Sequence, residues 1–248
     1  MIAGEEDVMS YRKTGRFMLV LAAVGLLTGF VGCIDNDKSL VIMHNVVSDE
    51  SCTYQIDPDY IRTRGFLDLN HPAFGSPTEP VYYFFPQVHN YMPTNLSTCN
   101  CELDAMAIQL KKATISYEWL IGEESLEIYG HGPLLGLEEG SFDIYLSGVV
   151  AAADTSGTPG QFVTHLRLIP PNVGTQLAAL STDAEEFVLG VHVTIKGTTL
   201  GGVDMVSNEF VYPIEFCWGC LSETCPDGSY PSCQPGQDDN ALECEESP

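Results

Sequence analysis

The feature that most constrains the fold is the alternation of apolar and polar residues in two segments near the C-terminal end. In residues 187–195 every second side chain is apolar, and residues 205–216 follow after the glycine-containing stretch 197–202. Successive side chains of a β-strand point to opposite faces, so a period of two indicates strands with one buried face. The two segments therefore predict a β-hairpin whose buried face carries Phe187, Leu189, Val191, Val193 and Ile195.

Similar strand-like segments occur throughout the preceding chain. Pro86 lacks a backbone N–H and predicts a sheet edge or a bulge, and the change of phase across Lys111 and Lys112 predicts a bulge. The one helical candidate lies between Pro171 and Asp183. About seven to nine strands with one short crossover helix predict an all-β, two-sheet, immunoglobulin-like sandwich over residues 40–216. The further expected strands are residues 40–47, 61–69, 82–91, 107–120, 142–149 and 162–168.

An uncharged apolar run, residues 17–32, follows a basic cluster that contains Arg12, Lys13 and Arg16. A membrane-spanning helix needs about 20 apolar residues, whereas a basic segment followed by a shorter apolar one is typical of an export signal. The run ends in Phe-Val-Gly-Cys, which resembles the lipobox of bacterial lipoproteins, although Phe30 stands where Leu is usual. We expect residues 1–32 to be a signal peptide, Cys33 to be lipidated, and residues 33–39 to form a tether.

Two alternatives to lipidation stay open, an uncleaved membrane anchor and soluble secretion. Ordinary signal peptidase needs a small residue three positions before the cut, and bulky Phe30 occupies that position before Cys33. A start at Met9 in place of Met1 would leave the segment before the apolar run purely basic. All of these readings predict export.

The cysteines indicate disulfides. The chain has nine, and assigning Cys33 to the lipid leaves an even number in an exported protein. Three of the remaining eight precede residue 102 and five follow residue 216, so complete pairing requires at least one bridge between the two groups. The connectivity itself stays open. The disulfide candidates are Cys52, Cys99, Cys101, Cys217, Cys220, Cys225, Cys233 and Cys244.

The pair Cys217 and Cys220 has the spacing of a redox motif or of half a zinc site. A redox pair gains reactivity from a helix N-terminus, and no helical pattern follows this pair. A zinc site would need a second CxxC or a histidine pair, and the sequence has neither. We therefore expect structural disulfides that staple a cysteine-rich tail, residues 217–248.

The chain is strongly acidic, with a net charge of -24. Nucleic-acid binding requires clustered cations that displace phosphate counterions, so nucleic acid is excluded as a partner. Acidity keeps a surface protein soluble, or it can serve divalent-cation binding. No EF-hand pattern occurs, and the acids around Asp238 and Asp239 predict a solvated tail.

The sequence predicts no catalytic residue, cofactor or metal site, and we expect a protein that is not an enzyme. It contains no HExxH, no G-x-S-x-G, no dinucleotide-binding glycine motif and no P-loop. The six histidines are scattered; His44 and His89 suit strand edges, and His192 lies on the polar face of its strand.

The closing segment, residues 197–220, resembles the end of a group of bacterial envelope lipoproteins with immunoglobulin-like sandwiches and a cysteine-rich tail. The resemblance implies a cell-envelope location, attached to the outer membrane through the lipid and facing the periplasm or the surface. We expect a non-enzymatic structural, adhesive or interaction role with an envelope protein or glycan. The alternatives are a lipoprotein that binds sugar or divalent cations, and a hydrolase with an unrecognised site.

The three functions predict different structural features. Acids clustered at one loop end would favour ligand binding, and a Ser–His contact would favour a hydrolase. The aromatic stretches 82–85 and 117–119 are expected in the core. If they are exposed together, they favour an interaction role.

Overall fold

The computed structural model describes residues 39–49, 51–56, 61–74, 79–94, 104–121, 140–179, 187–221 and 233–238. The chain divides into residues 1–35 and 36–248, and all elements described belong to the second unit. The predicted signal, residues 1–32, and all but the last residue of the predicted tether, residues 33–39, lie outside the described residues. The same holds for Cys33, Cys99, Cys101, Cys225 and Cys244.

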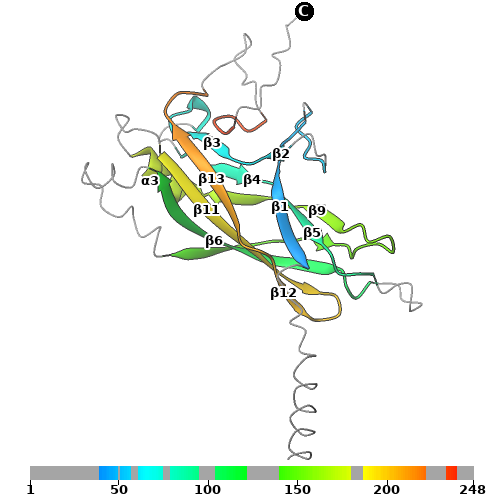
Figure 1. Ribbon diagram of the computed structural model, residues 1–248. Helices are drawn as coiled ribbons and strands as arrows, with labels where there is room; N and C mark the ends of the chain where they lie inside the picture. Colours follow the sequence, from blue (N-terminus) through cyan, green and yellow to red (C-terminus); the bar gives the residue numbers. More distant parts are fainter. Residues whose placement is uncertain are drawn as a thin grey trace, which may run out of the picture. The chain divides into compact units, whose positions relative to one another are not determined.

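The described part is mostly β and forms three sheets (Figure 1). One sheet has the order β2-β1-β5-β9, a second pairs β10 with β4, and the largest has the order β3-β13-β11-β6-β7, with β12 beside β11 and β8 beside β6. The strands are β1 (Leu40–Val46), β2 (Ile61–Arg62), β3 (Gly65–Asp68), β4 (Tyr82–Phe84), β5 (Pro86–Asn90), β6 (Ile108–Ile121), β7 (Ser141–Tyr145), β8 (Val149–Val150), β9 (Gly160–Val163), β10 (Leu166–Ile169), β11 (Phe187–Thr199), β12 (Asp204–Val206) and β13 (Phe210–Cys217). The helices are the 3₁₀-helix η3 (Pro72–Phe74) and the α-helix α3 (Pro171–Ala178).

The predicted hairpin is confirmed as β11 and β13, which pair antiparallel and lie side by side in Figure 1. All five apolar residues of the predicted β11 face are buried. The bulge predicted near Lys111 is also confirmed, because Lys196 pairs with Lys112 and Gly197 with Leu110, which leaves Lys111 unpaired in register. These long strands supply much of the hydrophobic core.

A single cluster of buried apolar residues joins the two larger sheets. Leu40 and Val88 contribute from the four-stranded sheet, and Ile115 and Val191 from the largest. The predicted helix is observed as α3, which buries Val173 and Leu177. A Cβ atom on Gly174 would lie 1.8 Å from the carbonyl oxygen of Pro80, so only glycine lets the helix approach that backbone.

The arrangement is not clearly a simple immunoglobulin-like sandwich. The expected strands 82–91 and 162–168 each divide, and each contributes to two sheets: β4 pairs with β10, and β5 pairs with β9. Pro86 begins β5 and has no N–H for a ladder, so the division falls beside it. Pro86 is not on an edge strand, since β5 lies between β1 and β9. The parallel pairing of β3 with β13 also departs from a chain of hairpins.

Candidate functional site

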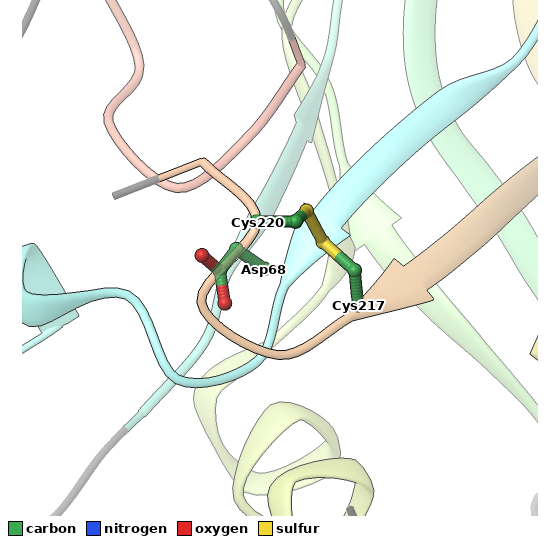
Figure 2. Close-up of side chains that lie close together, drawn as sticks. All are labelled: Asp68, Cys217 and Cys220. Atoms are coloured by element: carbon green, nitrogen blue, oxygen red, sulfur yellow. A yellow bond between two sulfur atoms is a disulfide. The ribbon is translucent and has the colours of Figure 1, made fainter. Parts of the chain in front are cut away.

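The loop that follows β13 combines a short disulfide with a buried carboxylate (Figure 2). Cys217 and Cys220 are bonded to each other, and their Cα atoms are 5.9 Å apart. Asp68, the last residue of β3, is fully buried beside them, and its carboxylate oxygen and both sulfur atoms lie within 4.8 Å of one another. In the disulfide state the sulfurs are not free to bind a metal.

The Asp68 carboxylate organises this loop through backbone hydrogen bonds. One oxygen accepts hydrogen bonds from the N–H groups of Gly219, at 2.6 Å, and Asn70, at 3.0 Å. The other oxygen accepts one from the N–H of Leu221, at 3.0 Å. Asp68 was not predicted as a site residue. The only feature of the sequence that marks it is the position of a charged residue between the two leucines of a strand-like segment.

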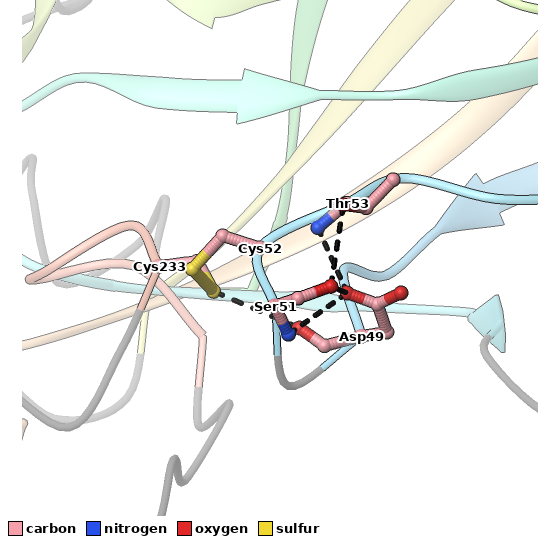
Figure 3. Close-up of a disulfide and its surroundings, with 5 residues drawn as sticks. All are labelled: Asp49, Ser51, Cys52, Thr53 and Cys233. Carbon is pink, nitrogen blue, oxygen red and sulfur yellow. Dashed lines mark hydrogen bonds between the residues drawn. A yellow bond between two sulfur atoms is a disulfide. The ribbon is translucent and has the colours of Figure 1, made fainter.

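The second disulfide joins Cys52 to Cys233, which are 181 residues apart in the chain (Figure 3). Each of the two cysteine groups, before residue 102 and after residue 216, contains an odd number of candidates, so complete pairing needs a bridge between them. This disulfide is such a bridge. In the chain-entropy account, a bridge over so long a loop contributes about 5 kcal/mol and one that encloses two residues contributes about 2 kcal/mol. The disulfide between Cys52 and Cys233 is therefore expected to contribute more to the free energy of unfolding than the one between Cys217 and Cys220.

Cys52 occupies a turn that Asp49 stabilises (Figure 3). One carboxylate oxygen of Asp49 accepts hydrogen bonds from the backbone N–H and hydroxyl of Ser51 and from the N–H of Thr53. These hydrogen bonds, that from the Ser51 hydroxyl first, lower the pKa of the Asp49 carboxyl below its usual 3.8. Cys52 has a φ of 58°, the left-handed conformation that favours glycine.

A row of aromatic side chains lies on one face of the sheet formed by β4 and β10. Tyr54 stacks on Phe85, with ring centroids 3.5 Å apart, and His165 contacts both Phe85 and Tyr83. The Arg167 guanidinium lies over the Tyr83 ring, 5.5 Å from its centroid. We call these five residues the aromatic row. His165 and Arg167 are exposed, and the other three are half-buried.

The aromatic stretches therefore divide between core and surface. Tyr82, Phe84, Tyr117 and Trp119 are buried, as expected of core residues. Tyr83 and Phe85 belong to the aromatic row on the opposite face. Strand alternation explains the division, because neighbouring residues of a strand point to opposite faces.

The expectation that Asp238 is part of a solvated tail is wrong. Asp238 is 6% exposed, and its carboxylate accepts hydrogen bonds from the Tyr82 hydroxyl, at 2.9 Å, and the Phe66 N–H, at 2.8 Å. Arg62 lies 3.4 Å from the same carboxylate. Burial raises the pKa of the Asp238 carboxyl, and the charge of Arg62 opposes only part of that increase.

The histidines have polar neighbours in the sheets. His192 is half-buried, and its two ring nitrogens each lie 3.0 Å from a carboxylate, one of Glu118 and one of Glu209. His89 is buried on the central strand β5 and contacts Gln87 and Tyr91. The expectation of an edge position is therefore wrong for His89, since β5 lies between β1 and β9. His192 lies beside two glutamates on the polar face of its strand.

A cavity of about 470 Å³ lies between the loops around Thr94, Asp104 and residues 151–155. The Asp104 carboxylate accepts hydrogen bonds from the Thr94 hydroxyl and the Met106 N–H. The Asp154 carboxylate is occupied by the residues of its own turn, Ser156 and Thr158. Both acids thus already accept hydrogen bonds from neighbouring residues, and alanine side chains form much of the wall.

Comparisons with protein-family models, curated proteins and solved structures find no match for this chain. The observations support a mostly β protein with several sheets and two disulfides among the described residues. In the described ranges, no helix is both long enough and apolar enough to cross a membrane.

Proposed function

We propose that this protein is attached by lipid at Cys33 to the outer membrane of a bacterial cell, facing the periplasm or the surface, and has a non-enzymatic interaction role. The aromatic row is the observation that supports the interaction role. Aromatic and arginine side chains are enriched where proteins bind one another. On a chain of net charge -24, exposed Arg167 also places a cationic group over the half-buried ring of Tyr83.

The proposed partner is an envelope protein or glycan that presents an apolar surface with an acidic group to the aromatic row. The guanidinium of Arg167 would pair with the acid, and the ring edges would cover the apolar part. We also propose that the domain is a divergent immunoglobulin-like sandwich. The shared core of the two larger sheets supports this relation.

The alternative functions have weaker support. A ligand-binding lipoprotein would need polar groups that converge on a cavity, and the carboxylates of Asp104 and Asp154 already accept hydrogen bonds from neighbouring residues. A hydrolase would need a base beside a nucleophile. His192 instead contacts two glutamates, and His89 contacts Gln87 and Tyr91.

The lipid anchor is tested by metabolic labelling of cells with a clickable fatty acid. Labelling of the wild-type chain is expected to disappear in Cys33→Ala and to persist in Phe30→Leu, which restores the usual lipobox residue. Undiminished labelling of Cys33→Ala would show that the lipid, if any, is attached elsewhere.

The interaction role is tested by placing a photo-crosslinking amino acid at position 165 in cells. The matched control carries it at position 211, where Val211 is exposed outside the aromatic row. We expect a cross-linked product from position 165 that weakens several-fold when Arg167→Glu is added, because the cation becomes an anion. Protease digestion of the product distinguishes a protein from a glycan. Equal cross-linking at both positions would contradict a role for the aromatic row.

A further inference from the structure

The two disulfides of the described chain have different surroundings. Cys52–Cys233 joins distant segments, whereas Cys217–Cys220 encloses only Trp218 and Gly219. Cys217 is half-buried at the end of β13, and Cys220 is exposed. Cys52 is likewise exposed and Cys233 half-buried, so exposure does not distinguish the two disulfides; they differ in the length of chain that each encloses.

The loop around Cys217–Cys220 is fixed by contacts that do not involve the sulfur atoms. Trp218 packs against Phe187 with ring centroids 6.2 Å apart. The Cys217 carbonyl accepts a hydrogen bond from the Leu69 N–H, and the Asp68 carboxylate accepts those of Gly219 and Leu221. These contacts would hold both cysteines in place after the disulfide opens, so reduction and reoxidation need no unfolding.

Asp68 places a carboxylate beside the cysteines. Its carboxylate is fully buried and within 4.8 Å of both sulfur atoms. A nearby negative charge disfavours a thiolate relative to a thiol. A thiol of the reduced pair that must ionise during exchange would therefore do so beside this carboxylate.

We propose that Cys217 and Cys220 form a reversible redox pair that exchanges two electrons with a dithiol, and that Asp68 is its positioning residue. In the reductive direction, a thiolate of the dithiol attacks the Cys220 sulfur, the Cys217–Cys220 bond breaks, and Cys217 leaves as a thiolate that takes up a proton. The second thiol of the reagent then loses its proton and attacks the mixed disulfide, which releases Cys220. The dithiol is oxidised to a disulfide, and its two electrons and two protons end on the cysteine pair.

The first experiment treats the purified full-length oxidised protein with dithiothreitol and alkylates the thiols at timed intervals. Peptide mass spectrometry then follows each cysteine pair separately. Once both pairs are reduced, we expect Cys217–Cys220 to re-form at least about tenfold faster than Cys52–Cys233, because its cysteines are 3 residues apart in the chain and not 181. Near-ultraviolet circular dichroism should stay unchanged, and the pair should close again with oxidised dithiothreitol. Equal rates, or loss of the dichroism as the pair opens, would overturn the proposal.

The second experiment tests Asp68 through the pH dependence of Cys220 alkylation in the reduced protein. In Asp68→Asn the midpoint of the pH profile should fall by about one pH unit, since a neighbouring negative charge is removed. Asp49→Asn is the matched control, because Asp49 lies in the turn that carries the other disulfide, and it should leave the profile unchanged. A profile that is the same in wild type and Asp68→Asn would exclude the role of Asp68. If Asp68→Asn does not fold, the wild-type kinetics still decide whether the pair is reversible.

Discussion

The carboxylate of Asp238 connects the C-terminal segment 233–238 to the buried parts of the fold. It contacts the Tyr82 hydroxyl, which in turn lies 3.0 Å from the Tyr212 hydroxyl, and the Asn45 amide donates a hydrogen bond to Tyr212 at 2.9 Å. Burial raises the pKa of both tyrosines, most strongly that of Tyr82. Such a network stabilises a protein only while each member has its partners.

The raised pKa of Asp238 predicts an unusual dependence of stability on pH. Between its unfolded value of 3.8 and its higher folded value, the folded state binds more protons than the unfolded state. The contribution of this carboxyl is therefore complete below about pH 3.8 and is lost as pH rises through the folded pKa. We expect the free energy of unfolding of wild type to fall relative to that of Asp238→Asn as pH rises from 4 to 8. Urea denaturation at each pH measures it, and a pH-independent difference would contradict the prediction.

Asp49 is the control for this measurement, because its pKa is shifted in the opposite direction. Its hydrogen bonds in the turn lower the pKa, so its contribution is present above 3.8 and is lost as pH falls through the lower folded value. Asp49→Asn should therefore lose stability relative to wild type at neutral pH, and the difference should shrink in acid.

The position of Asp238 could not be predicted from the sequence. Its neighbours, Asp239 and Asn240, have the composition of a solvated tail. Its burial depends on Phe66, 172 residues earlier in the chain, and on a neighbouring cysteine, Cys233, whose partner the sequence does not specify. Asp68 was missed for the same reason, since Gly219 and Leu221, two of the three groups that donate hydrogen bonds to its carboxylate, lie more than 150 residues away.

Three turns of the fold share one backbone design. In each, the residue at the start exchanges hydrogen bonds with the residue four positions later: Asp49 with Thr53, Asp154 with Thr158, and Thr199 with Val203. The fourth position has positive φ in all three and is occupied by Cys52, Gly157 and Gly202, respectively. Only in the first does a residue with a side chain take this conformation, and that residue forms the long-range disulfide.

This comparison predicts the effect of substituting Cys52 once the disulfide is absent. The double variants Cys52→Gly/Cys233→Ser and Cys52→Ser/Cys233→Ser both lose a bridge worth about 2–5 kcal/mol. Of the two, the glycine variant should be more stable by about 1 kcal/mol, because a left-handed backbone strains residues that carry a Cβ atom. Urea denaturation of the pair measures the difference. A serine variant at least as stable as the glycine variant would show that the turn does not strain residue 52.

At the scale of elements, local sequence patterns predicted the pairing of strands that are neighbours in the chain. They did not predict the pairing of strands that are far apart in the chain. The alternation in residues 187–195 predicts the buried face of β11, and the phase change predicts the bulge at Lys111. The sequence of residues 82–90 cannot reveal that they serve two sheets, because sheet membership depends on the pairing of β4 with β10 and of β5 with β1 and β9. It also does not specify the parallel pairing of β3 with β13, which are separated by most of the chain.

For the whole molecule, the dominant electrostatic property is the net charge of -24. The ion pairs Arg64–Glu215 and Lys112–Asp143 are partly exposed, and such pairs contribute little, whereas Arg62–Asp238 is mostly buried. The excess negative charge therefore acts mainly as repulsion, which is greater in the compact state than in the unfolded chain.

This repulsion predicts that salt stabilises the folded protein at neutral pH. The Debye length falls from about 30 Å at 0.01 M salt to about 8 Å at 0.15 M, so most of the stabilisation should occur in that range. The urea midpoint at pH 7, measured against sodium chloride concentration, is expected to rise and then level off. The same titration near pH 4.2, the isoelectric point of the sequence, is the control, and it should show a much smaller rise because the net charge is close to zero. An equal rise at both pH values would indicate that the salt acts through hydration and not by screening the charge of the chain.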